Sequence, residues 1–435
     1  MEPVSGGAFA LATGVKAVLF FTLLMLSITV TIILERKVAG FIQDRSGPNR
    51  VGPWGLLQVI ADGLKFLLKE ETHPEEAHRT FFMLAPLLSL VPATALFAVI
   101  PFAAPLPTSA GLVEVVVADV PVGFLYVLAI ASLGVYGIVM GGWASGSKYS
   151  FLGGLRGSAQ MVSYEVGLAL SLVPLVLLTG EVRLPELVAL QQGYGDAALS
   201  FGTWLIVPLL FGFILFTVSG LAESNRLPFD LPEAEEELIG GYHTEYSAMK
   251  FGMFFLGEYA HMITTAGLIT VFFLGGWDIP FWAGDNIRVA ADGTVIGEPA
   301  VWKTVLTFLS FAVKTGLLVL VFVWIRWTLP RFRYDQLMQL GWKFFIPAAT
   351  VYVVLTAGAI LGLDAAGLEP GPAYALALAA LNLALVAVLL FVVDRGRLLA
   401  GAHHARDRAE RDRPMGGGEG AADVAAEGPP AVAEG

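Results

Sequence analysis

Seven carboxylates gather in the stretch 223–246, between two long apolar runs. They are Glu223, Asp230, Glu233, Glu235, Glu236, Glu237 and Glu245. Arg226 is the base that we expect to oppose them directly. Carboxylates clustered near a medium of low dielectric raise one another's pKa and share protons. The stretch therefore predicts a proton relay, and the alternative is a solvated acidic helix that docks on a basic partner.

Three charged residues interrupt apolar runs, where each costs about 2.5–3.5 kcal/mol at the centre of a membrane helix. Glu165 and Glu258 are each the eighth residue of their run, and Lys314 lies near the middle of another. The equal depth of the two acids favours a proton or ion path; the alternative is paired groups that fix helix contacts. His261 follows Glu258 by three residues and shares its helical face, where we expect a satisfied core histidine.

A polar connection follows the first apolar run, and residues 56–70 within it predict an amphipathic helix. Its polar face consists of Gln58, Asp62, Lys65 and Lys69. Such a helix is typical of the membrane surface, where long lysines reach the water. Glu35, Arg36 and Lys37 end the first run, which is also typical of an interface anchor.

The composition shows which solvent these elements meet. The chain of 435 residues is 56% hydrophobic and 14% charged, so lipid surrounds most of it. It has no cysteine, which excludes disulfides and iron–sulfur clusters held by thiolates of this chain. His261 is the one histidine well inside an apolar run, so a haem held by two membrane histidines is not expected. Any electron carrier must then belong to a partner, and we expect no metal site here.

The apolar runs predict an all-α integral membrane protein with about nine transmembrane helices. The expected spans are 13–34, 80–100, 120–142, 158–179, 203–222, 251–275, 303–327, 344–363 and 374–393. Residues 1–393 are expected to form one membrane domain. The tail 394–435 is rich in Gly, Ala, Pro and charge, so we expect it to be disordered.

The basic residues predict the orientation. Connections on one side carry 21 Lys and Arg, against 4 on the other. The basic side is cytoplasmic by the positive-inside rule. Nine spans then place the N-terminus outside, and the acid-rich stretch and the C-terminus in the cytoplasm.

Three long stretches resemble signature sequences of one family, the H subunits of respiratory complex I, the proton-pumping NADH:quinone oxidoreductase. They are ERKVAGFIQDRSGPNRVGPWGLLQVIADGLKFLLKE, AESNRLPFDLPEAEEELIGGYHTEYS and WIRWTLPRFRYDQLMQLGWK. They occur in this order, each in an expected cytoplasmic connection. The resemblance covers residues from about 13 to 393.

The resemblance implies a bacterial inner-membrane subunit that forms much of a quinone chamber and couples quinone reduction to proton translocation. The family's proton-path positions match Glu165, Glu223, Glu233, Glu235, Glu237 and Glu258. Positions near the quinone passage match Glu35, Arg36, Lys37, Asp62 and Lys65. Glu236 is an extra acid outside the family pattern.

The resemblance also implies a division of labour among subunits. Quinone is the substrate, while FMN and the iron–sulfur clusters belong to partners and this chain binds no cofactor. The implied partners are the iron–sulfur and quinone-site subunits of the peripheral arm, the antiporter-like and small membrane subunits, and the lipid bilayer, with no nucleic acid.

Two other functions fit parts of the pattern. One is the homologous membrane subunit of a hydrogenase-type complex, which neighbouring genes would distinguish. The other is a secondary ion transporter that uses Lys314 and the acids. Transporters of that kind usually contain internal repeats, and the sequence shows none.

Overall fold

The computed structural model describes residues 6–108, 111–192, 204–232, 240–280, 282–285, 287–289, 295–368 and 371–394. The chain divides into the units Met1–Leu389 and Leu390–Gly435. In the second unit the described residues are the last turn of one helix. The expected disordered tail lies outside the described residues from position 395 onward.

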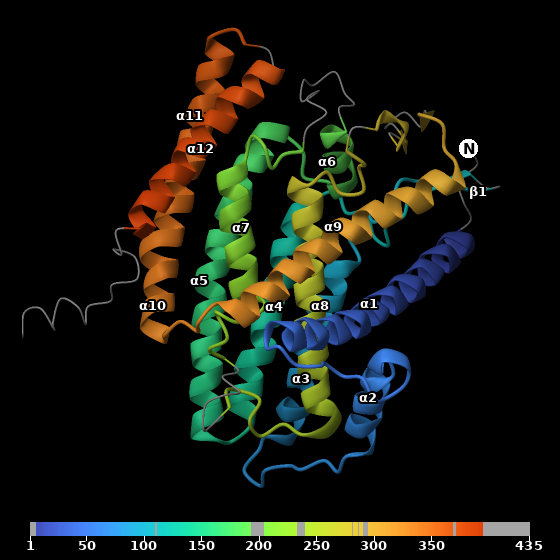
Figure 1. The fold of residues 1–435 in the computed structure, drawn as a ribbon, viewed down its shortest axis with the longest axis vertical. Helices are drawn as coiled ribbons and strands as arrows, with labels where there is room; N and C mark the ends of the chain where they lie inside the picture. The colour runs from blue at the N-terminus through green and yellow to red at the C-terminus, as the bar shows by residue number, and fades with distance from the viewer. Residues whose placement is uncertain are drawn as a thin grey trace, which may run out of the picture. The chain divides into compact units, whose positions relative to one another are not determined.

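Helices make up nearly all of the regular structure (Figure 1). They are α1 (Gly6–Ile42), α2 (Gln58–Leu68), α3 (Arg79–Phe97), α4 (Gly123–Ala144), α5 (Lys148–Thr179), α6 (Leu184–Gln191), α7 (Leu210–Glu223), α8 (Ala248–Phe273), α9 (Val301–Thr328), α10 (Tyr334–Gln339), α11 (Ile346–Ala365) and α12 (Pro372–Asp394). Short helical turns are η1 (Pro53–Gly55), η2 (Ala283–Asp285) and the π-helical η3 (Leu340–Phe345). Two small antiparallel hairpins pair β1 (Leu106–Thr108) with β2 (Gly111–Val113), and β3 (Arg288–Val289) with β4 (Val295–Ile296).

The expected all-α membrane class is confirmed. In the described ranges, seven helices are long and apolar enough to cross a membrane. They are Thr13–Ile42, Arg79–Phe97, Gly123–Ala144, Lys148–Thr179, Val301–Thr328, Tyr334–Ala365 and Ala373–Phe391. Each coincides with an expected span.

The two remaining expected spans differ from each other. The span 203–222 contains α7, which has 14 residues and is short for a crossing. The span 251–275 contains α8, whose 26 residues measure about 39 Å at 1.5 Å per residue. The count of nine and the orientation stay predictions.

At several ends a helix extends well beyond the expected span that it contains, as α1 and α5 show. Residue 34 is the expected end of the first span, but α1 continues to Ile42 and carries Glu35, Arg36 and Lys37 as helical residues. Likewise, α5 begins at Lys148 rather than near 158. Hydropathy falls at these charged ends, yet the helices continue, and at the end of α1 Glu35 and Arg36 form ion pairs within the fold.

The helix α8 forms the centre of the packing, with 18 of its 26 residues buried. It packs against α1, α2, α3, α7 and α9. Small residues permit this close approach, as in other membrane helix bundles. A Cβ at Gly267, for example, would lie 3.1 Å from Cδ1 of Ile100. The helix thus touches most of the elements that carry the charged residues.

Lys314 on α9 holds the turn that follows α8. Its ammonium donates to the carbonyls of Leu274, Gly276 and Asp278, at 2.7, 3.1 and 2.6 Å. It also lies 4.2 Å from the ring centroid of Trp204. Burial raises the pKa of the Asp278 carboxyl to about 6, although the Trp204 indole donates to it at 2.8 Å. These contacts favour a structural role for Lys314 over ion binding.

We expect Lys314→Met to lower the thermal stability of the protein by the equivalent of about 2–4 kcal/mol, because three carbonyls lose a charged donor. Proton translocation per electron in the assembled complex should stay at the wild-type value. Thermal melting of the purified complex and pumping in sealed vesicles measure the two effects.

Lys303→Met is the matched control, because Lys303 lies at the start of the same helix and donates to the Glu298 carbonyl at an exposed site. It should change neither quantity. A Lys314→Met complex that melts normally but no longer translocates protons would contradict the structural role.

Candidate functional site

Two cavities lie on either side of α8. The first, here called the α2 cavity, has a volume of about 240 Å³ and is lined by α1, α2 and α8. The second, here called the Glu223 cavity, has a volume of about 40 Å³ and is lined by α3, α4, α5, α7 and α8 with the loops beside them. Phe255 and Leu256 of α8 face the first cavity, and Gly257 and Glu258 face the second.

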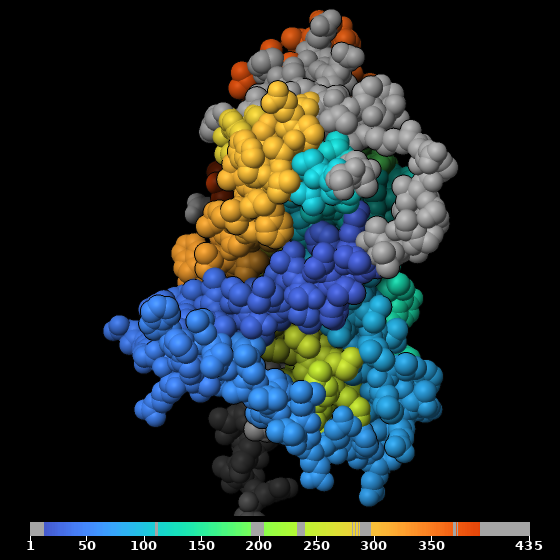
Figure 2. All heavy atoms as spheres, turned by 90° about the vertical axis from the view of Figure 1, so that its right-hand side faces the viewer, coloured from blue at the N-terminus to red at the C-terminus, as the bar shows by residue number. Residues whose placement is uncertain are grey.

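The α2 cavity combines an apolar wall with a few charged groups. Arg36, Asp62 and Lys65 line it beside Phe66 and Phe251. Figure 2 views the molecule from this side, with α1 and α2 in blue and the chain near residue 250 in yellow-green. An apolar cavity with a few polar groups is typical of a site for a small hydrophobic molecule.

The charged groups of the α2 cavity are held in place by one another. The Arg36 guanidinium lies 2.5 Å from the Asp62 carboxylate, which also accepts from the Gln58 amide at 3.1 Å. The Lys65 ammonium lies 4.5 Å from the ring centroid of Phe66. The predicted amphipathic helix is confirmed as α2. Asp62 and Lys65 of its predicted polar face line the cavity.

Two residues expected beside the quinone passage do not line the α2 cavity. Among the described residues, Lys37 belongs to the lining of neither cavity. Glu35 is also absent from the lining of the α2 cavity and is 5% exposed. It accepts a hydrogen bond from the Tyr259 hydroxyl at 2.7 Å.

The ion cluster, defined here as Glu35, Arg226, Glu258, Tyr259 and Arg326, joins α1 to α8 and α9. One Glu35 oxygen lies 2.5 Å from Arg326, and the other lies 3.3 Å from Arg226. The Arg226 Nε forms an ion pair with Glu258, and its guanidinium lies 4.0 Å from the ring centroid of Tyr259. Two carboxylates and two guanidiniums therefore balance in charge, which buried ions require.

Arg226 is the shared member of this cluster. It lies in the loop after α7 and is 3% exposed. Burial by itself lowers the pKa of its guanidinium, but Glu258, Tyr259 and Glu35 raise the pKa above the usual value. Arg226 consequently stays charged while it contacts an acid from each of two helices.

Among the described residues, Arg226 forms its ion pairs with acids outside its own stretch, and four of the seven acids that it is expected to oppose lie outside the described residues. Arg226 turns toward two acids of the apolar runs instead. Asp230 pairs with Arg331 at 3.0 Å. Proximity in sequence suggests the first pairing, whereas the fold brings α1 and α8 closer to the guanidinium.

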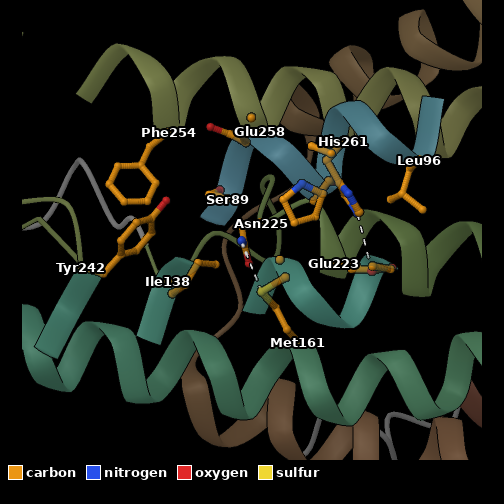
Figure 3. Close-up of a pocket in the computed structure, with 16 residues that line it drawn as sticks. Ser89, Leu96, Ile138, Met161, Glu223, Asn225, Tyr242, Phe254, Glu258 and His261 are labelled. Atoms are coloured by element: carbon orange, nitrogen blue, oxygen red, sulfur yellow. Dashed lines mark hydrogen bonds and ion pairs between the residues drawn. The ribbon is translucent and has the colours of Figure 1, made fainter. Parts of the chain in front are cut away.

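The Glu223 cavity brings together two acids and a histidine (Figure 3). Glu223 is the last residue of α7 and is 5% exposed, and Glu258 and His261 extend from α8. The His261 Nε2 lies 3.7 Å from a Glu223 oxygen. The predicted shared face of Glu258 and His261 is confirmed, since both line this cavity.

The expectation that His261 is a satisfied core histidine is wrong. Its Nε2 is buried, and no described residue forms a hydrogen bond with it. The imidazole points toward Glu223, which is too far for a direct hydrogen bond.

Other expected acids lie elsewhere. Glu165 on α5 is half-buried, accepts a hydrogen bond from the Ser132 hydroxyl of α4 and does not itself line the Glu223 cavity, although it interacts electrostatically with Glu223. Four acids lie outside the described residues: Glu233, Glu235, Glu236 and Glu237. The described site therefore contains Glu223 and Glu258 of the expected proton-path residues.

Sequence reasoning misses Tyr259 and Arg326, and it misses the bridging role of Arg226. The one signal in the sequence for Tyr259 is that it directly follows Glu258, an acid inside an apolar run. Arg326 lies near the end of an apolar run, where arginine is common at a membrane surface. In the described part of the chain, no group of three or more His, Asp or Glu is placed to hold a metal ion.

Comparison with known proteins gives one consistent result. A family described as NADH dehydrogenase matches residues 15–357. The chain is 48% identical over 341 residues to the NADH-quinone oxidoreductase H subunit of Rhodospirillum centenum, covering 78% of this chain and 91% of the relative. Identity to an H subunit of the same enzyme from Geobacter metallireducens is 47% over 340 residues, covering 78% and 93%. Identity to the H subunit from Magnetococcus marinus is 44% over 354 residues, covering 81% and 93%.

Proposed function

The chain belongs to the family of NADH-quinone oxidoreductase H subunits, and from this premise we propose that it couples quinone reduction to proton translocation. A quinone occupies the α2 cavity, and Glu258 and Glu223 move protons on the other side of α8. The observation that carries this proposal is the ion cluster, which links the two sides through Glu35, Arg226 and Glu258.

The α2 cavity suits a quinone because both parts of that molecule find matching surfaces. Phenylalanines and aliphatic residues line most of it, which suits an isoprenoid tail. Arg36 and Lys65 supply positive charge where the ring gains electrons. Reduction of the quinone takes two electrons and two protons and forms the quinol. The electrons come from partners that carry FMN and iron–sulfur clusters, because this chain has no cysteine.

The ion cluster provides a physical route for the coupling. Negative charge on the quinone attracts Arg36, which is next to Glu35 on α1. A shift of α1 there changes how Arg226 is shared between Glu35 and Glu258. When Arg226 moves toward Glu35, its positive charge withdraws from Glu258, which then favours the protonated form. When Arg226 returns, Glu258 releases the proton into the Glu223 cavity.

Further acids extend this path in the proposal. Glu165 continues it on α5, beside Ser132 of α4. Glu233, Glu235 and Glu237, which lie outside the described residues, serve in the proposal as further proton-carrying groups. Lys37 supports the basic surface beside Arg36.

The same proposal places the chain in its complex. It lies in the bacterial inner membrane and contacts the iron–sulfur and quinone-site subunits of the peripheral arm through its cytoplasmic connections. Antiporter-like and small membrane subunits pack against its other helices. The exposed leucines of α2, among them Leu64 and Leu67, then rest at the lipid surface.

Gly63→Leu tests the quinone site directly. Gly63 lies on α2 and lines the cavity, and a Cβ there meets no atom within 4 Å. Leucine favours the helix more than glycine does, so α2 keeps its structure. We expect NADH:quinone turnover to fall about tenfold, because an overfilled site costs roughly 1–3 kcal/mol. NADH:ferricyanide turnover, which reports electron input, should not change.

Gly358→Leu is the matched control. Gly358 lies exposed on α11, and a Cβ there also meets no atom within 4 Å. Its quinone turnover should equal that of the wild type. Unchanged quinone turnover in Gly63→Leu would remove the α2 cavity as the quinone site, and equal losses of both activities would indicate failed assembly.

A further inference from the structure

His261 presents a buried nitrogen to a cavity that two acids also line. Its Nε2 forms no hydrogen bond with any described residue. A buried polar atom without a hydrogen bond costs stability, so packing alone is a poor explanation for a histidine at this position. The atom lies 3.7 Å from a Glu223 oxygen, and Figure 3 shows the ring pointing at that carboxylate.

His261 shares a helical face with Glu258 and faces Glu223 across the cavity. It follows Glu258 by three residues on α8, so the two side chains are neighbours on one helical face. Glu223 faces it from the end of α7. The cavity volume of about 40 Å³ is enough for one water molecule, which can bridge a gap too long for direct transfer.

The other described walls of the cavity offer no second base near the two acids. The wall from α3 contributes Ser89 and apolar residues, and the wall from α5 contributes Met161. Arg226 is engaged with Glu258 and Glu35 in the ion cluster. Among the described lining residues, His261 is therefore the one base beside the two carboxyl groups.

We infer that His261 carries protons between Glu258 and Glu223. The Nε2 lone pair takes the proton as the O–H bond of the Glu258 carboxylic acid breaks. The imidazolium then turns back toward Glu223, whose carboxylate takes the proton through one bridging water. An imidazole suits this task because its ordinary pKa is about 6.5, so both of its forms are accessible near neutral pH. The inference rests on the proposed function, since it assumes that Glu258 and Glu223 move protons.

The test uses His261→Gln in the assembled complex. Glutamine keeps a polar side chain but cannot carry a proton near neutral pH. We expect quinone-linked turnover to fall by about 10²-fold, the lower end of the range that positioned acid–base groups contribute. The solvent deuterium isotope effect on turnover should rise, because proton transfer becomes the slow step. A purely structural role would lower turnover without changing the isotope effect.

Two further variants make the result specific. His261→Asp restores a protonatable group and should recover part of the turnover lost in His261→Gln. If the ring only fills space or supplies positive charge, His261→Asp should do no better than His261→Gln. His73→Gln is the matched control, because His73 is exposed beside Glu71 and Lys250 and lines neither cavity.

The outcomes separate this inference from the proposed function. Normal turnover and a normal isotope effect in His261→Gln, with losses in Glu258→Gln and Glu223→Gln, would overturn the relay through His261 alone. Normal translocation in all three variants would overturn the proton path itself. If His261→Gln fails to assemble on a native gel, the turnover and isotope effect of His261→Asp decide: reduced turnover with a raised isotope effect supports the carrier, and wild-type values or a loss of turnover without a raised isotope effect contradict it.

Discussion

Glu258→Gln is expected to stop proton translocation and to slow quinone-linked turnover by about 10²–10⁴-fold, the range attributed to general acid–base groups. Glutamine has the size of glutamate and can still accept a hydrogen bond from Arg226, so the cluster keeps its shape. It cannot bind and release a proton, and the path loses the member that touches both Arg226 and the Glu223 cavity. Translocation per electron in sealed vesicles measures the first effect, and NADH:quinone turnover measures the second.

Glu245→Gln is the matched control for this experiment. Glu245 belongs to the same acid-rich stretch but lines neither cavity. It is partly exposed, and a charge at the surface contributes about 1 kcal/mol or less, so this variant should behave as the wild type. If Glu258→Gln assembles and pumps at the wild-type ratio, the ion cluster only stabilises the protein. Equal losses in Glu245→Gln would indicate a general effect of charge in the stretch.

The membrane helices are predictable because their signal is local. An apolar run of about 20 residues is visible in sequence, and seven expected spans coincide with long apolar helices of the described chain. The position of Glu258 and His261 on one face is predictable for the same reason, since three residues make nearly one helical turn.

The end of α1 shows where local signals fail. Hydropathy falls at Glu35, which predicts a boundary there, yet the helix continues to Ile42. The reason is that Glu35 is paired with Arg226 and Arg326, which are 191 and 291 positions away in sequence. A local sequence pattern cannot show partners so far away in sequence. The continuation of the helix is therefore visible only in the folded chain.

The ion cluster itself is unpredictable from one sequence for the same reason. Arg226 lies seven residues from the nearest group of glutamates, and a sequence argument pairs it with those neighbours. The fold brings it instead to acids from α1 and α8. Glu35, which is expected at the quinone passage, contacts Arg226, Arg326 and Tyr259 and does not line the α2 cavity.

Arg226→Met is expected to have the largest effect on assembly. It removes a buried cation that Glu258 contacts, while Glu35 keeps Arg326. Removing one partner of a buried ion pair costs about 3–5 kcal/mol, because the other charge stays buried and loses its compensation. The complex should therefore accumulate poorly, and what remains should melt at a lower temperature. A native gel of the membranes and thermal melting measure these effects.

Arg183→Met is the control for loss of an arginine. Arg183 pairs with Asp119 and Glu186 at a partly exposed site before α6, where an ion pair contributes about 1 kcal/mol or less. Its assembly should equal that of the wild type. A normal amount of Arg226→Met complex would show that Glu258 tolerates the loss of this guanidinium.

The double variant Arg226→Met with Glu258→Gln separates stability from coupling. Both ions of this pair are gone, and Glu35 still contacts Arg326 and Tyr259. Assembly and melting temperature should recover toward the wild type, because a buried ion pair can often be replaced by neutral groups without loss. Proton translocation should stay absent, since neither the shared cation nor the proton-binding acid is present. Recovery of translocation together with assembly would mean that the cluster holds helices together and that protons cross α8 by another route.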